Sequence, residues 1–409
     1  MSKTIFILGG YGVFGGRLAE RLIAQTCHQV IIAGRSAEKA AEFCKRRGGG
    51  EPYATDRDDV TSLHRAFAQT APDIVIDASG PFDFDGTWHC YRVATCAINA
   101  GAHYVDLADN ADFVSNISML DELAREAGRI VLSGVSSVPC LSSAVIDELS
   151  KDFAEITAIN TAIIPGNRAP RGRAVIESIL SQVGKPFAQL EGGQWRSRYC
   201  WSTLETTTLS LPGQKALARR LISPIEVPDQ RLLPARYGSP TVRFSAGLEL
   251  RMLHLGLWVM ACLVRLGLLR SLRPLTALAH RVATWFEPFG TDRGGMVVDV
   301  AGVAHDGTVL GRRWTLMAEQ GDGPQVPATP ARALIDAIVA GTVKAGAAPA
   351  VSVLSLGDIE KHFAPYAIRT GVCELGGSHL AHNHTAGRIA RAERTDDADI
   401  PPAQIIAEL

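Results

Sequence analysis

The sequence predicts an α/β protein, in which a doubly wound parallel sheet is followed by a second, α+β domain with a mixed or antiparallel sheet. Three observations support this. An apolar stretch at residues 4–8 runs into a glycine-rich turn and then into a helical pattern. Short apolar and helical stretches then alternate to about residue 150, as in parallel sheets with helices on both faces. Later, Asp306-Gly307 between two strand-like stretches indicates a β-hairpin.

The elements of the first domain succeed one another at the spacing of βαβ units. The expected strand at 73–78 runs apolar without alternation, as a strand covered on both faces must. Pro139 is placed to open a further helix, because the first helical turn needs no N–H from it. Strands are expected at residues 4–8, 29–33, 53–56, 73–78, 103–107 and 130–133, and helices at 17–22, 37–47, 61–69, 86–100 and up to about 127.

A chain of 409 residues is too long for one hydrophobic core, so we expect two domains. We place a dinucleotide-binding domain at residues 1–153, a substrate and dimerisation domain at 154–375 and a polar tail at 376–409. We expect the helix at 331–341 to pack back on the first domain. The second domain should contain strands at 156–164, 296–304 and 312–318, one long or two short strands within 198–211, and a helix at 172–183.

Bulk properties exclude some classes of protein. The formal net charge of -1 gives no electrostatic footprint for nucleic acid. Met1-Ser2-Lys3 leads directly into the first expected strand, so we expect no signal peptide. The eight cysteines show no C-x-x-C spacing, which is typical of reduced thiols in a cytoplasmic protein.

The glycine-rich turn after the first strand predicts a dinucleotide site. Gly10, Gly12 and Gly15 meet the spacing G-x-G-x-x-G between a strand and a helix. Backbone N–H groups at the helix start can hold a pyrophosphate, and glycines let the backbone approach it. We therefore assign to cofactor binding the residues Gly10, Tyr11, Gly12, Val13, Phe14 and Gly15.

The end of the second strand predicts which dinucleotide binds. An enzyme that uses NAD usually keeps an acidic residue there for the ribose 2′-hydroxyl, but this chain has Gly34-Arg35-Ser36. Arg35 can pair with a 2′-phosphate, Ser36 can add a hydroxyl, and Lys39 follows one helical turn later. The sequence therefore favours NADP over NAD.

The fourth strand ends in a turn that we also assign to the cofactor. Ala78, Ser79, Gly80 and Pro81 come at the carboxyl edge of the sheet, where such folds place the middle of the dinucleotide and its nicotinamide.

Five motifs in order resemble the NADP-binding domain of the saccharopine dehydrogenase-like oxidoreductases. They are Gly-Gly-Tyr-Gly-Val-Phe-Gly-Gly, Ala-Gly-Arg-Ser, Asp-Ala-Ser-Gly-Pro-Phe, Ala-Gly-Ala-His-Tyr-Val-Asp-Leu and Val-Ser-Ser-Val-Pro, and they cover roughly residues 3–150. The resemblance implies a Rossmann domain of a nicotinamide oxidoreductase, with Ser79, Gly80 and Pro81 on the cofactor. It also implies that Tyr104 and Asp106 face the cleft. Asp109 is the nearest acidic residue after their motif.

Tyr104 and Asp106 are our candidate catalytic residues. They stand at positions i and i+2 of a strand and so point to the same side. For an imine or amine substrate, Asp106 would supply a counter-charge and Tyr104 a hydroxyl donor. In the alternative interpretation, Asp106 caps the helix that begins near Asn110, and Tyr104 only packs.

An extended short-chain dehydrogenase is the main competing Rossmann enzyme, because Gly9, Gly12 and Gly15 also fit G-x-x-G-x-x-G. That chemistry needs a tyrosine with a lysine four residues later, which lowers the pKa of the tyrosine. None of the seven tyrosines has a lysine at that spacing, so this alternative fails on its chemistry.

Two stretches of the second domain could contact a substrate or partner. Arg168 and Arg171 lie before an expected helix and could hold a carboxylate or phosphate, or they could form a solvated basic loop. The apolar stretch at 247–269 falls short of the roughly 17 to 25 residues that a spanning helix needs. It should be a buried helix or a dimer interface in a homo-oligomer, or else lie peripherally on a membrane or admit a lipid-like substrate.

We expect no metal, since His379, His382 and His384 have no cysteine or carboxylate nearby. The sequence thus predicts an NADP-dependent oxidoreductase that acts on a small molecule, either an amino-acid imine or an apolar enoyl or keto group. The alternative is a nucleotide-binding protein without turnover at a membrane or partner surface.

Overall fold

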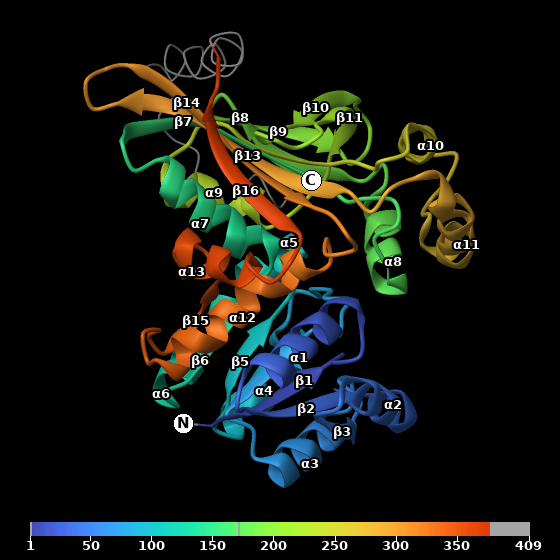
Figure 1. The fold of residues 1–409 in the computed structure, drawn as a ribbon, viewed down its shortest axis with the longest axis vertical. Coiled ribbons are helices and arrows are strands. Elements are labelled where there is room, and N and C mark those ends of the chain that lie inside the picture. Colours follow the sequence, from blue (N-terminus) through green and yellow to red (C-terminus); the bar gives the residue numbers. More distant parts are fainter. Residues whose placement is uncertain (1, 171, 377–409) are drawn as a thin grey trace.

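The computed structural model describes residues 2–170 and 172–376, and it consists of two lobes, each built on one large sheet. In Figure 1 the first domain occupies the lower half of the molecule and the second domain the upper half. The predicted fold class is confirmed: one sheet is entirely parallel, and the other is mixed.

The first sheet has the strand order β15-β6-β5-β4-β1-β2-β3. The strands β2 and β3 are added on one side of β1, and β4, β5 and β6 on its other side, so the order of the strands reverses between β1 and β4. Such a reversal is the switch point at which doubly wound sheets bind dinucleotides. Its strands are β1 (Thr4–Leu8), β2 (Gln29–Gly34), β3 (Glu51–Ala54), β4 (Ile74–Asp77), β5 (His103–Asp106), β6 (Ile130–Ser133) and β15 (Gly346–Pro349). The helices α1 (Val13–Gln25), α2 (Ala37–Arg47), α3 (Val60–Thr70), α4 (Arg92–Asn99), α5 (Ala111–Asn116), α6 (Asp121–Glu126) and α7 (Ser142–Leu149) connect or flank them.

Continuous apolar strands fill the cores on both faces of this sheet. Ile5 and Ile7 of β1 join one buried cluster, while Phe6 and Leu8 join the cluster on the other face. Successive side chains of a strand point to opposite faces, so a strand without polar alternation must be covered on both sides, as we expected.

The seventh strand, β15, was not predicted. It pairs in parallel with β6, although it comes more than 200 residues later in the chain. Its sequence, Gly346-Ala-Ala-Pro349, has no β-branched or aromatic side chain, and these are the residues that mark a strand. Before it, α12 (Gln325–Val339) returns to the first domain and packs on α1, which confirms the packing predicted for this helix.

The second domain is a mixed seven-stranded sheet of order β10-β11-β12-β7-β13-β14-β16. Only β7 and β12 run parallel, and the predicted hairpin is confirmed as β13 and β14. The strands are β7 (Phe153–Ile164), β10 (Glu205–Leu209), β11 (Leu217–Pro224), β12 (Val242–Ala246), β13 (Gly294–Ala304), β14 (Val309–Ala318) and β16 (Ile368–Glu374), beside the pair β8 (Pro186–Glu191) and β9 (Gln194–Tyr199). The further helices are α8 (Arg173–Gln182), α9 (Asp229–Tyr237), α10 (Arg251–Arg265), α11 (Thr276–Phe286) and α13 (Leu356–Glu360).

The apolar stretch at 247–269 forms α10, but this helix is not buried in the domain. Only His254 and Ala261 of the helix are buried, whereas Met252, Leu255 and Val259 are exposed. Of the alternatives left open for this stretch, a helix buried in the domain does not agree with this exposure, because an apolar sequence does not show what covers it. Within the described ranges, no helix is both long and apolar enough to cross a membrane.

Candidate functional site

The glycine-rich turn packs closely against the end of β4. Gly9 has φ +72°, and a Cβ on it would lie 2.7 Å from the carbonyl oxygen of Ala78. A Cβ on Gly15 would lie 2.4 Å from the carbonyl oxygen of Gly9. Gly12 is the N-cap of α1 and offers no side chain to cap it, so the first N–H groups of this helix are free to hold an anion.

Tyr11 joins this turn to the end of β2. Its hydroxyl oxygen accepts a hydrogen bond from the backbone N–H of Ser36 (3.2 Å), and it lies so close to Gly34 that a Cβ there would come within 2.5 Å of it. Arg35 is exposed, and its guanidinium makes no hydrogen bond or ion pair with another described residue. The structure thus brings together the predicted residues of the turn with Arg35 and Ser36.

The turn after β4 is fixed by an ion pair that the sequence did not reveal. The buried carboxylate of Asp77 accepts hydrogen bonds from the backbone N–H and the hydroxyl of Ser79. Arg57 lies 3.2 Å from the other oxygen of Asp77 and donates to the carbonyl oxygens of Ser79 and Pro81. Asp77, an acidic residue at the end of an apolar strand, was the only sign in the sequence of a buried charge here. Its partner Arg57 could not be predicted, because it lies twenty residues earlier in the sequence.

Tyr104 and Asp106 lie inside the domain, and neither is among the side chains that line the cavity described below. One oxygen of Asp106 accepts from Ala108 N (3.0 Å), Ser133 Oγ (2.9 Å) and Gly134 N (2.8 Å). Its other oxygen has no hydrogen-bond partner among the described residues. Burial raises the pKa of Asp106 to about 7, against the effect of these donors. A catalytic role for this pair stays a prediction.

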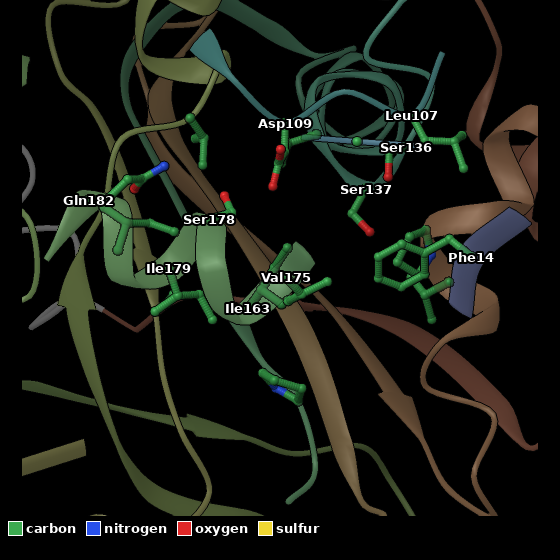
Figure 2. Close-up of a pocket in the computed structure, with 18 of the residues that line it drawn as sticks. Phe14, Leu107, Asp109, Ser136, Ser137, Ile163, Val175, Ser178, Ile179 and Gln182 are labelled. Carbon is green, nitrogen blue, oxygen red and sulfur yellow. The ribbon is translucent and has the colours of Figure 1, made fainter. Parts of the chain in front are cut away.

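A cavity of about 470 Å³ lies between the two domains. Phe14, Ala78, Gly80 and Pro81 of the predicted cofactor site line it on one side. The second domain contributes mainly apolar side chains. In Figure 2, Ile163, Val175 and Ile179 lie across from Phe14 and Leu107. The other apolar lining residues include Phe82, Val138, Trp201, Ile225, Phe244, Leu248, Met296 and Leu316.

Asp109 is one of three aspartates of the first domain that line this cavity, with Asp83 and Asp112. Figure 2 shows its carboxyl group at the cavity, which Ser136, Ser137 and Ser178 also line. The carboxyl group of Asp109 is accessible from the cavity. Because protein surrounds the cavity, the charged form of this group is poorly solvated, which raises the pKa of Asp109. Its own backbone N–H opposes the rise, and the charge of Asp83 adds to it. No other described residue donates a hydrogen bond to its carboxyl group.

The basic loop lines the cavity through Pro165, Gly166, Ala169 and Pro170, but Arg168 is not among the lining residues. Arg168 is exposed, and its guanidinium donates to the carbonyl oxygen of Pro288 (3.1 Å). Arg171, its predicted companion, lies outside the described residues, as do His379, His382 and His384. Across residues 2–170 and 172–376, no group of three or more histidine, cysteine or acidic residues is arranged to hold a metal.

Comparison with known families identifies the first domain. Residues 5–132 match the family model described as the saccharopine dehydrogenase NADP binding domain. These residues are thus similar to that domain, which confirms the resemblance carried by the five motifs. The match supports a nicotinamide dinucleotide as the cofactor. No match among curated proteins was found for the chain.

Solved structures extend the likeness to both domains. The apo saccharopine dehydrogenase (L-Glu forming) of Saccharomyces cerevisiae superposes with a TM-score of 0.65 at 14% identity, covering 92% of this chain and all of the yeast chain. This shows a shared fold. GenD2 from gentamicin A biosynthesis, solved with NAD, reaches a TM-score of only 0.40 at 15% identity over 92% of this chain and 97% of its own.

Proposed function

We propose that the chain is an NADP-dependent oxidoreductase that transfers a hydride between NADP and a largely apolar, uncharged substrate with a keto or enoyl group. The observation that best supports this proposal is the cavity between the domains. It begins at the turn after β4, where the sheet presents its carboxyl edge, and its far wall is apolar. Ligands of doubly wound sheets bind at this edge, and apolar walls suit apolar ligands.

The residues present fit a nicotinamide dinucleotide. The free N–H groups at the start of α1 suit its pyrophosphate, and Arg35 with Ser36 suits a 2′-phosphate. When bound, the cofactor supplies the hydride. This chain's own contribution would be to hold Ala78, Gly80 and Pro81 in place through Arg57 and to exclude water from the apolar cavity.

The charges on the cavity wall argue against an amino-acid imine as the substrate. Such a substrate carries carboxylates, which need cationic partners. Among the described lining residues the only arginine or lysine is Arg273, and it is already paired with Glu177 (2.7 Å) and Asp83 (3.5 Å). The remaining charged lining residues are acidic: Asp109, Asp112 and Glu226, of which Asp112 and Glu226 are ion-paired with Arg231. No unpaired cation of the described lining is thus left for a carboxylate, and an ionised Asp109 would repel one.

Asp109 is the group best placed to exchange a proton with such a substrate. A raised pKa keeps a carboxyl group protonated closer to neutral pH, where it can donate to a developing enolate or alkoxide oxygen. We expect Asp109→Asn to lower kcat about 10²- to 10⁴-fold. NADPH affinity should stay unchanged, because Asp109 is not in the glycine-rich turn. Rate measurements from pH 5 to 9 would test this. In the unmutated protein kcat should fall as the pH rises and the carboxyl group of Asp109 ionises, and this fall should be absent in Asp109→Asn.

The test of the proposed function is NADPH oxidation by the purified chain, offered matched series of neutral ketones, enoyl thioesters and amino-acid imines. We expect turnover to rise with the apolar chain length of the ketone or enoyl series. Preferred turnover of imines with two carboxylates would contradict the proposed substrate. NADPH binding without oxidation of any series would favour the non-catalytic alternative.

A further inference from the structure

The outward face of α10 is apolar and exposed. Met252, Leu255, Val259 and, just after the helix, Leu266 are all exposed, Leu266 to 72%. Their spacings of three, four and seven residues place them on one side of the helix. The opposite side carries the buried His254 and Ala261. The helix is therefore anchored by one face and presents a second apolar face to the outside.

A second stripe of the same kind runs along α11 and its flanks. Leu275, Leu278, Trp285 and Phe289 are exposed, Trp285 to 79% and Phe289 to 74%. Their spacings of three, seven and four residues again fall on one helical face. Trp285 and Phe289 are the most exposed aromatic side chains of the described chain. Exposed stripes on neighbouring helices mark an interaction site more than single exposed residues do.

The two helices form one surface. Figure 1 shows α10 and α11 together at one side of the second domain, beyond α8. Their inner faces share a single cluster with α8, to which Leu257, Val264 and Ala279 contribute. We call the exposed residues of α10, α11 and their flanks (Met252, Leu255, Val259, Leu266, Leu268, Leu275, Leu278, Trp285 and Phe289) the helical surface.

The charge of this segment is mainly positive. Between positions 251 and 289 the sequence contains five arginines and one acidic residue, Glu287. Arg251, Arg270 and Arg281 are exposed, and no described acidic residue pairs with them. Arg265 is also exposed, and its guanidinium carbon lies 4.7 Å from the ring centre of Tyr199.

A second copy of the chain fits this surface poorly. In a twofold dimer the same patch lies on both sides of the contact. Arginines would then face arginines, and Glu287 is the one acidic residue between positions 251 and 289 that could pair with them. An anionic lipid surface satisfies both features, because aromatic and aliphatic side chains enter the headgroup boundary while arginines meet lipid phosphates.

We propose that the helical surface docks the protein on membranes that contain anionic lipids. This goes beyond the proposed oxidoreductase activity and does not rest on it. It also has a consequence for access to the cavity. The helix α8 contributes Ile176 and Leu180 to the cluster beneath the helical surface, and Val175 and Ile179 to the cavity wall. An apolar substrate dissolved in the bilayer would thus be one helix away from the cavity.

The experiment is co-sedimentation of the full chain with vesicles of phosphatidylcholine alone or with one third phosphatidylglycerol. We expect binding to the anionic vesicles only, weaker at about 1 M than at about 0.1 M salt, because the Debye length falls from about 10 Å to about 3 Å. Trp285→Ser with Phe289→Ser should reduce the bound fraction about tenfold. Arg270→Glu with Arg281→Glu should do the same.

Matched controls separate the helical surface from general surface changes. Trp88→Ser removes an exposed tryptophan of the first domain, and Arg65→Glu reverses an exposed charge on α3; both should bind vesicles like the unmutated chain. Circular dichroism and NADPH titration of every variant check folding and the cofactor site. Equal binding of all variants, or no binding of the unmutated chain, would overturn the proposal. So would a dimer in sedimentation that dissociates on Trp285→Ser with Phe289→Ser and does not bind vesicles.

Discussion

At the scale of single residues, Arg35 should decide which dinucleotide binds. It stands at the end of β2 with a free guanidinium where enzymes that use NAD keep a carboxylate. A hydrogen-bonded charge pair with a 2′-phosphate contributes about 1.5–3 kcal/mol. We expect Arg35→Asp to weaken NADPH binding by roughly 10- to 150-fold and NADH binding far less. Fluorescence titration with both nucleotides measures this, with Arg65→Asp as control. Equal affinity of the unmutated chain for NADPH and NADH would contradict the assignment.

Asp106 gives a second residue-scale prediction, because its pKa of about 7 is well above that of an aspartate in an unfolded chain. The folded protein then binds this proton more tightly than the unfolded chain does. The free energy of unfolding should therefore fall as the pH rises from about 4 to 7. Asp106→Asn cannot ionise, so between pH 5 and 8 it should gain roughly 1–4 kcal/mol of stability relative to the unmutated protein.

Denaturant titrations across that pH range measure this gain, and turnover per folded molecule separates the two roles of Asp106. Normal turnover with a changed pH dependence of stability would make it structural. Lost turnover with little change in stability would support the catalytic role predicted from the sequence. A stability difference that does not vary with pH would show that Asp106 is ionised in the folded protein.

At the scale of elements, two glycines of the same turn should respond differently to one substitution. A Cβ on Gly12 meets only the carbonyl oxygen of Gly9, at 3.0 Å, and its φ of -76° suits any residue. A Cβ on Gly15 would lie 2.4 Å from that oxygen and 3.0 Å from Ala78. We expect Gly12→Val to abolish nucleotide binding with the fold retained, and Gly15→Val to lower the melting temperature. Calorimetry and circular dichroism distinguish them; unchanged nucleotide binding by Gly12→Val would contradict the site.

Features encoded by neighbouring residues could be predicted from the sequence, whereas features that depend on distant contacts could not. β1, the turn and β2 were predictable because local glycine spacing and apolar runs specify them. β15 was not, since pairing with β6 rather than strand propensity makes it a strand. The ion pair of Arg57 with Asp77 depends on a contact between β4 and a loop twenty residues earlier. The apolar cavity wall likewise comes from segments far apart in the chain, which no local pattern joins.

At the scale of the whole molecule, the first domain depends on a segment that follows the second domain in the chain. Arg21 of α1 is buried and donates to the side chains of Gln325 (2.8 Å) and Thr329 (2.8 Å) on α12. It also lies over the ring of Tyr366, 4.3 Å from its centre. Through these contacts and the pairing of β15 with β6, the C-terminal part of the described chain packs on the first domain and completes its sheet.

Substitution of Arg21 tests how much the packing of α12 on α1 stabilises the first domain. Arg21→Ala would leave buried acceptors on α12 without a donor and remove packing from Tyr366, so we expect a loss of about 2–4 kcal/mol in the free energy of unfolding. Arg17→Ala is the matched control on the same helix, because Arg17 makes only a partly exposed ion pair with Glu20, and it should cost less than about 1 kcal/mol. Chemical denaturation followed by fluorescence measures both. Equal stability of the two variants would show that α12 contributes little to the first domain, whereas the expected difference would show that it folds together with the segment that returns to it.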